Sequence, residues 1–179
     1  MDVLDPTGTT APDTPANPVV ELPTVADTHA FGRRLAALLR AGDLLVLTGP
    51  LGAGKTALTQ GIGAGLGVLG DITSPTFVIA RVHRPDPDRA SGRGARPALV
   101  HADAYRLGDA VDPRAEIDDL DLDASVDEAV TVVEWGEGLV ERLVDAHLRV
   151  RLDRRDDDTR LVELVPVGGD WAQRLATLR

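Results

Sequence analysis

One eight-residue segment, GPLGAGKT at 49–56, constrains this chain more than any other feature. It matches the pattern GxxxxGK[ST] in full, between an apolar run at 44–48 that predicts a buried strand and a stretch at 55–66 that predicts a glycine-rich helix. Glycines let the backbone wrap closely around an anion with several N–H groups pointing inward, and the following helix adds the positive end of its dipole. The segment therefore predicts a phosphate-binding loop.

The side chains of this segment point to a nucleotide with Mg²⁺. Lys55 is the only lysine among the 19 basic residues of the chain. A compact ammonium on a flexible stem suits the β- and γ-phosphates, whereas a rigid guanidinium fork does not, and the Thr56 hydroxyl is a ligand for Mg²⁺. The residues predicted to hold the nucleotide are Gly49, Pro50, Leu51, Gly52, Ala53, Gly54, Lys55, Thr56 and Ala57.

Length and composition are those of one folded domain behind a tail. Of the 179 residues 43% are hydrophobic, too many for a disordered chain, and the lack of cysteine excludes disulfides and thiolate metal sites. We expect residues 1–18, rich in Pro, Thr and Asp, to be disordered and 19–179 to form the domain. With no signal-peptide pattern and no apolar stretch near ~18 residues, we expect a cytoplasmic protein without membrane association.

Short apolar runs alternate with helical patterns along the domain, which predicts a three-layer α/β architecture. The strands are expected at 19–22, 44–48, 77–82, 98–102, 129–133, 148–152 and 161–165. A capping box of Thr24 and Asp27 predicts the start of a helix that ends before Gly42, and a last helix is expected over 170–178. The stretch 83–97, rich in Pro, Gly and Arg, predicts a mobile loop.

Acidic residues give the chain a formal net charge of −10. Ten of them lie between Asp103 and Glu128, against two basic residues. Such a surface repels phosphate backbones, so we expect no direct, tight binding of nucleic acid. A solvated acidic face and a face that docks a partner are both compatible with this segment.

A phosphate-binding loop needs a second carboxylate that holds Mg²⁺ directly or through water. Two acids follow apolar strands: Glu134 comes after 130–133, and Asp103 comes after 99–102. An acid at a strand end is also a common helix cap, so the spacing alone does not choose between them.

Several classes of P-loop protein do not fit the sequence. Guanine recognition needs an Asn-Lys-x-Asp element, but the only asparagine is Asn17 and there is no second lysine. An LSGGQ-like signature is absent, and the chain is too short for the lid of an AAA+ module. A free-standing small-molecule kinase remains an alternative, with a lid built from Arg84, Arg89, Arg93 and Arg96.

Four segments follow one another along the chain: GDLLVLTGPLGAGKT at 42–56, Ser74-Pro75-Thr76, HADAYR at 101–106 and Val133-Glu134-Trp135. This combination closely resembles the TsaE (YjeE) family, the ATPase subunit of the bacterial machinery that makes threonylcarbamoyladenosine in tRNA. The resemblance runs from about 22 to 152. It implies a P-loop NTPase fold with a mixed β-sheet, and slow ATP hydrolysis coupled to a complex of TsaB and TsaD.

The resemblance also implies roles for single residues. Lys55, Asp103 and Glu134 are expected to be catalytic, with Thr56 and Glu134 at Mg²⁺. Thr76, in a switch-like segment near the γ-phosphate, and Trp135 are expected to contact the ATP.

The remaining matches are less specific. Tyr105 and Arg106 either anchor the Asp103 loop or meet the partner, and the segments 24–28 and 155–158 are candidates to frame the adenine. Pro50 stands where the family usually has an acid, and the 83–97 loop and the tail are longer than usual. A nucleotide-bound assembly factor with negligible hydrolysis is a third possible class.

Overall fold

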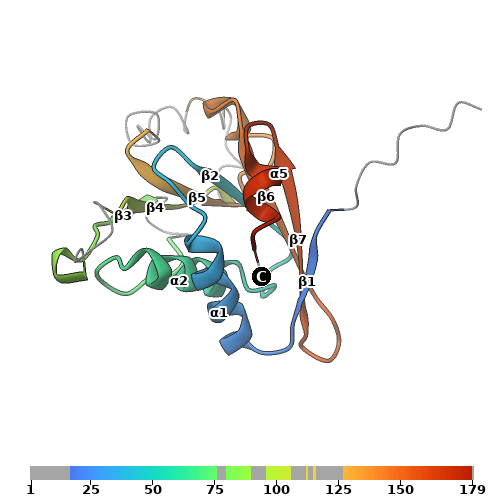
Figure 1. The fold of residues 1–179 in the computed structure, drawn as a ribbon. Coiled ribbons are helices and arrows are strands. Elements are labelled where there is room, and N and C mark those ends of the chain that lie inside the picture. Colours follow the sequence, from blue (N-terminus) through green and yellow to red (C-terminus); the bar gives the residue numbers. More distant parts are fainter. Residues whose placement is uncertain are drawn as a thin grey trace, which may run out of the picture.

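The computed structural model describes residues 17–75, 80–89, 96–105, 112, 115 and 127–178 (Figure 1). The strands are β1 (Val19–Leu22), β2 (Leu44–Thr48), β3 (Ala80–His83), β4 (Ala98–Asp103), β5 (Ala129–Glu134), β6 (His147–Arg154) and β7 (Arg160–Val167). The helices are α1 (Val25–Ala36), α2 (Lys55–Leu66) and α5 (Trp171–Leu175), with short 3-10 turns η1 (Pro87–Arg89) and η3 (Glu141–Leu143).

The strands form one seven-stranded sheet in the order β1-β7-β6-β2-β5-β4-β3. Strand β2 is parallel to both of its neighbours, β5 and β6, and β4 is parallel to β5. The pairs β1–β7, β6–β7 and β3–β4 are antiparallel. The predicted mixed sheet is therefore confirmed. Because β2, β4 and β5 run the same way, their carboxyl ends meet at one edge of the sheet, where open α/β sheets bind ligands.

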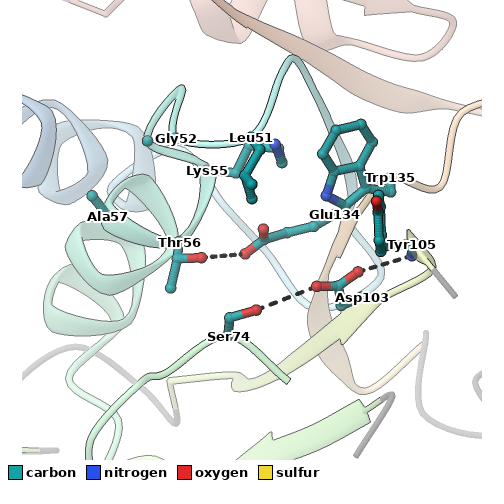
Figure 2. A pocket seen from close by; sticks show the side chains of 11 residues that line it. Leu51, Gly52, Lys55, Thr56, Ala57, Ser74, Asp103, Tyr105, Glu134 and Trp135 are labelled. Atoms are coloured by element: carbon teal, nitrogen blue, oxygen red, sulfur yellow. Dashed lines mark hydrogen bonds between the residues drawn. The ribbon is translucent and has the colours of Figure 1, made fainter. Parts of the chain in front are cut away.

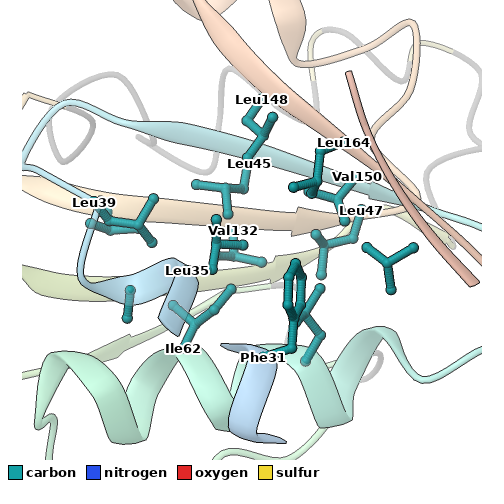
Figure 3. Packing of buried hydrophobic residues seen from close by; sticks show 14 of the residues in the cluster. Phe31, Leu35, Leu39, Leu45, Leu47, Ile62, Val132, Leu148, Val150 and Leu164 are labelled. Atoms are coloured by element: carbon teal, nitrogen blue, oxygen red, sulfur yellow. The ribbon is translucent and has the colours of Figure 1, made fainter. Parts of the chain in front are cut away.

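Apolar side chains cover both faces of the sheet and explain the runs in the sequence. Every residue of β2 and β5 is buried, as expected of central parallel strands. On one face, α1 and α2 pack against the strands through residues such as Leu35 and Ile62 (Figure 3), and α5 adds Trp171 to the same cluster. On the other face, Val46, Val100 and the rest of a smaller cluster pack against the segment 139–144, which includes η3. The α/β fold class is confirmed.

Close contact between α1 and α2 fixes the helix that follows the glycine-rich loop. A Cβ atom on Gly61 would lie 2.5 Å from the carbonyl oxygen of His29, and one on Gly32 would lie 2.6 Å from that of Leu58. Glycine at both positions thus lets the two backbones approach. The predicted capping box is confirmed at the start of α1: Thr24 Oγ1 accepts from the N–H of Asp27 at 3.1 Å, and the Thr24 N–H donates to Asp27 at 2.9 Å.

The ends of the chain differ in detail from the expectation. Asn17 and Pro18, assigned to the tail, bond to β7: the Asn17 amide donates to Glu163 at 2.8 Å, and the Leu164 N–H donates to the Pro18 carbonyl at 2.9 Å. Helix α5 ends at Leu175 rather than at 178, because the next turn closes with bonds three residues back instead of four.

Some expectations fall on residues outside the described ranges. They include the tail at 1–16, Thr76, the first part of the strand expected at 77–82, 90–95 of the long loop, Arg106 and most of the acidic segment at 103–128. The described part of that loop contains η1. In the ranges that the structure describes, no helix has both the length and the apolar character to cross a bilayer.

Candidate nucleotide site

The glycine-rich segment forms a tight loop between β2 and α2. Gly49, Gly52 and Gly54 have φ angles of 134°, 81° and 104°, which side-chain-bearing residues rarely adopt. A Cβ atom on Gly49 would overlap the carbonyl oxygen of Leu152 on β6. Gly54 is the N-cap of α2 and supplies no side-chain cap, so the free N–H groups of the first helical turn are available to an anion.

A cavity of about 350 Å³ opens at this turn, at the carboxyl edge of the sheet (Figure 2). Its lining residues come from the loop and α2, from the ends of β4 and β5, and from the segment after α2. They are Leu51, Gly52, Gly54, Lys55, Thr56, Ala57, Ser74, Asp103, Tyr105, Glu134 and Trp135.

Most of the predicted site residues therefore come together in one cavity. Three loop residues do not line it but shape it: Gly49 and Pro50 offer their carbonyl oxygens to Lys55, and buried Ala53 closes the loop with a 3.2 Å bond from its N–H to the Pro50 carbonyl. Thr76 lies outside the described residues.

Lys55 is folded back over the loop. Its Nζ donates to the carbonyl oxygens of Gly49 at 2.7 Å and Pro50 at 3.0 Å, and it lies 4.0 Å from the centroid of the Trp135 ring. The residue is 5% exposed. Burial lowers the pKa of its ammonium, and the negative charges of Glu134 and Asp103 oppose that change. An anionic ligand in the cavity would compensate the buried positive charge.

The two carboxylates face the cavity from paired positions on adjacent parallel strands. The Cα atom of Asp103 on β4 pairs with that of Glu134 on β5, and both residues are almost fully buried. The Glu134 carboxylate accepts from the hydroxyl of Thr56 at 3.0 Å and lies 2.8 Å from Nε2 of His101. Glu134 is thus tied directly to the residue predicted to bind Mg²⁺.

Asp103 has different contacts. It accepts from the Ser74 hydroxyl at 3.3 Å and from the backbone N–H of Tyr105 at 2.8 Å. Figure 2 shows both bonds, with Asp103 lying between Ser74 and the backbone of Tyr105. Asp103 therefore joins the end of β4 to the segment that leads into Thr76.

The aromatic residues form one wall. Trp135 has a φ of 61°, which is unusual for a residue with a side chain. Its backbone N–H donates to the carbonyl oxygen of Leu47 on β2 at 3.1 Å. Its ring meets the ring of Tyr105 edge-on, with centroids 5.2 Å apart. A strained backbone conformation persists only where the surrounding structure holds it, and such residues cluster at functional sites.

The sequence that forms this site matches the model of one protein family. The family model of TsaE, described as threonylcarbamoyl adenosine biosynthesis protein TsaE, matches residues 22–162. This chain belongs to the TsaE family.

Proteins of the same family are similar in sequence to this chain over most of its length. The TsaE protein of Streptomyces coelicolor is 57% identical over 146 residues, which cover 79% of this chain and 92% of that protein. The Mycobacterium tuberculosis protein is 54% identical, covering 78% and 82%, and the Bacillus subtilis protein is 36% identical, covering 81% and 83%. All three are named tRNA threonylcarbamoyladenosine biosynthesis protein TsaE. The crystal structure of Bacillus subtilis YdiB matches with a TM-score of 0.70 and 27% identity, over 90% of this chain and 93% of that one.

Three residues of the TsaE motifs have roles that the sequence alone does not predict. Ser74 and Tyr105 line the cavity, and His101 contacts Glu134. The alternation of side chains along a strand is the signal for His101, because it lies two residues before Asp103 and so faces the same side of β4.

The candidate adenine segments of this TsaE chain do not line the cavity. At 24–28 the side chains cap α1, and in the turn between β6 and β7 Arg155 pairs with Glu21 at 2.9 Å. The neighbouring Arg154 and Arg160 do reach the loop: their guanidinium atoms lie 3.6 Å and 3.3 Å from where Cβ atoms on Gly52 and Gly54 would be. Assignment of the adenine contacts stays a prediction.

The lowered pKa of Lys55 predicts a pH dependence of stability. Between the lowered pKa of the folded chain and the ordinary value of 10.5, the unfolded chain binds more of this proton than the folded chain does. The free energy of unfolding of the nucleotide-free protein should therefore rise with pH in this window, relative to that of Lys55→Met, which lacks the titrating group.

Urea unfolding of both proteins at a series of pH values up to 10.5 measures this difference. The Lys55→Met variant serves as the control for the wild-type protein, because the two proteins share every other titrating group. The free energy of unfolding of the wild-type protein minus that of Lys55→Met should increase as the pH rises, and a value that stays constant or decreases would contradict the buried, desolvated ammonium.

Proposed function

We propose that this chain is a Mg²⁺-dependent ATPase subunit that acts with TsaB and TsaD proteins in the cytoplasm, where threonylcarbamoyladenosine is made in tRNA. Membership of the TsaE family supports the pathway. The observation that supports the chemistry is the uncapped first turn of α2 beside Lys55, Thr56 and two buried carboxylates in one cavity.

The residues present fit a nucleoside triphosphate with a bound Mg²⁺. The cavity volume lies at the lower end of the range for ligand sites, and its floor is a helix N-terminus that favours phosphate. Among the described residues, no group of three His, Asp or Glu side chains is placed to hold a metal. A Mg²⁺ site built on phosphate oxygens and waters needs only one or two protein ligands, and Thr56 with Glu134 provides them.

Each residue then has a defined task. The N–H groups of the loop and of α2 hold the phosphates, and Lys55 leaves the loop carbonyls to follow the γ-phosphate. Mg²⁺ would neutralise negative charge on the β- and γ-phosphates. Glu134 and Thr56 would hold Mg²⁺. Asp103 accepts a proton from the attacking water or orients it.

Other classes receive less support. A kinase lid needs its arginines at the phosphates, but Arg84 and Arg96 do not line the cavity, and Arg96 donates to the Gly65 carbonyl at the far end of α2. The side chains of Arg89 and Arg93 lie outside the described residues. The net charge of −10 argues against tight binding of tRNA by this chain alone.

The two carboxylates should separate binding from hydrolysis. We expect Glu134→Gln to weaken binding of ATP in the presence of Mg²⁺ by about 10-fold or more, because the metal loses its carboxylate. We expect Asp103→Asn to bind ATP normally and to lose about 10²-fold or more in hydrolysis, because the water loses its base. Titration calorimetry and phosphate release measure the two effects, and the reverse pattern would show that the roles are exchanged.

Partners should complete the site. No arginine lines the described cavity, and stabilisation of transition-state charge by an arginine is worth about 10³-fold or more in P-loop enzymes. We therefore predict slow phosphate release by the chain alone and a rise of at least about 10-fold when TsaB and TsaD are added. The rise should shrink with added salt, because the acidic segment at 103–128 favours electrostatic docking.

The control for this measurement is TsaB and TsaD with Lys55→Ala in place of the wild-type chain. Brisk release by the isolated chain, unchanged by the partners, would favour a free-standing enzyme. Binding of ATP without turnover in the full mixture would favour an assembly factor.

A further inference from the structure

His101 is a buried polar residue that makes one polar contact within the described part of the chain. It lies on β4 and is 0% exposed, with buried Leu99, Val100 and Ala102 around it in sequence. Its Nε2 lies 2.8 Å from Oε1 of Glu134, and its Nδ1 has no hydrogen-bond partner within the described part of the chain. A buried polar atom without a partner costs free energy, so stability alone would favour an apolar residue here.

The contact with Glu134 fixes the direction of the hydrogen bond. The carboxylate is an acceptor, so the imidazole tautomer that satisfies it has its proton on Nε2 and donates. The Thr56 hydroxyl donates to the same oxygen, Oε1, at 3.0 Å. Two donors therefore hold one oxygen of Glu134, and Figure 2 shows the second oxygen directed away from Thr56.

The two donors differ in what holds them. Thr56 lies in the first turn of α2 and is itself expected at the metal, whereas His101 belongs to a strand whose register with β5 is fixed by the sheet. A Glu side chain has several rotatable bonds and needs such a support to present one oxygen in a constant direction. His101 is the support that does not depend on the ligand.

We propose that His101 is a positioning residue, whose Nε2–H holds Oε1 of Glu134 so that the carboxylate faces the place of Mg²⁺. The inference rests on the proposed function, because it assigns His101 a task at the metal side of the same site. It concerns the hydrogen bond and not a change of charge on the ring.

Two substitutions separate the donor from the bulk of the side chain. His101→Gln can place an amide N–H near the position of Nε2, whereas in His101→Asn the amide stops one carbon short. Thr131→Val is a matched control, because Thr131 is also fully buried, lies on the neighbouring strand β5, and its hydroxyl has no partner within the described residues.

The measurement is titration calorimetry of a non-hydrolysable ATP analogue into each protein, once with Mg²⁺ and once with EDTA. The quantity compared is the ratio of the Kd in EDTA to the Kd in Mg²⁺. We expect this ratio to fall about 10-fold in His101→Asn, with the Kd in EDTA unchanged, and to stay near the wild-type value in His101→Gln and Thr131→Val. A purely structural role of His101 would weaken binding equally with and without the metal.

The other outcomes decide the question as well. A wild-type ratio in His101→Asn, or an equal fall in the Asn and Gln variants, would overturn the role of the donor. If His101→Asn does not fold, as judged by circular dichroism, the Gln variant decides alone: a retained ratio supports the donor, and a lost ratio overturns it. A ratio near one in the wild-type protein would instead refute the Mg²⁺ site of the proposed function, and His101's role would fall with it.

Discussion

The unsatisfied N–H groups at the start of α2 are the feature on which the rest of the structure depends. They need a loop whose backbone can turn tightly in front of them, and the three glycines with positive φ provide it. They also need the helix to be held firmly, and close packing at Gly32 and Gly61 joins it to α1. The central position of β2, paired on both sides, fixes the point from which the loop starts.

Buried charge is the second constraint, because a lysine and two carboxylates share one small cavity. Lys55 is stabilised by two carbonyl oxygens and by the face of Trp135, and each carboxylate accepts hydrogen bonds from fixed donors. Charges removed from water are costly unless they are paired in this way. The ammonium of Lys55 is thus paired with carbonyl oxygens of the loop. An anionic ligand would replace these oxygens as its partner.

Local patterns predicted much of this arrangement, and long-range contacts decided the rest. The helix after the glycine-rich motif, the apolar run before it and the Thr24–Asp27 box each depend on neighbouring residues, and the structure confirms all three. The spacing did not choose between Glu134 and Asp103, because only the pairing of β4 with β5 shows that Glu134 reaches Thr56 while Asp103 reaches Ser74. The contact of His101 with Glu134 likewise joins residues 33 positions apart.

The most direct test of the account is the affinity of the chain for ATP with Mg²⁺, measured by titration calorimetry for the wild-type protein and for Lys55→Ala, with GTP as a competitor. The account predicts that the wild-type chain binds ATP in preference to GTP. It also predicts that Lys55→Ala loses most of this affinity while its circular dichroism spectrum is unchanged, because the variant lacks the ammonium group that lines the cavity. Equal binding of ATP by both proteins, or a preference of the wild-type chain for GTP, would contradict it.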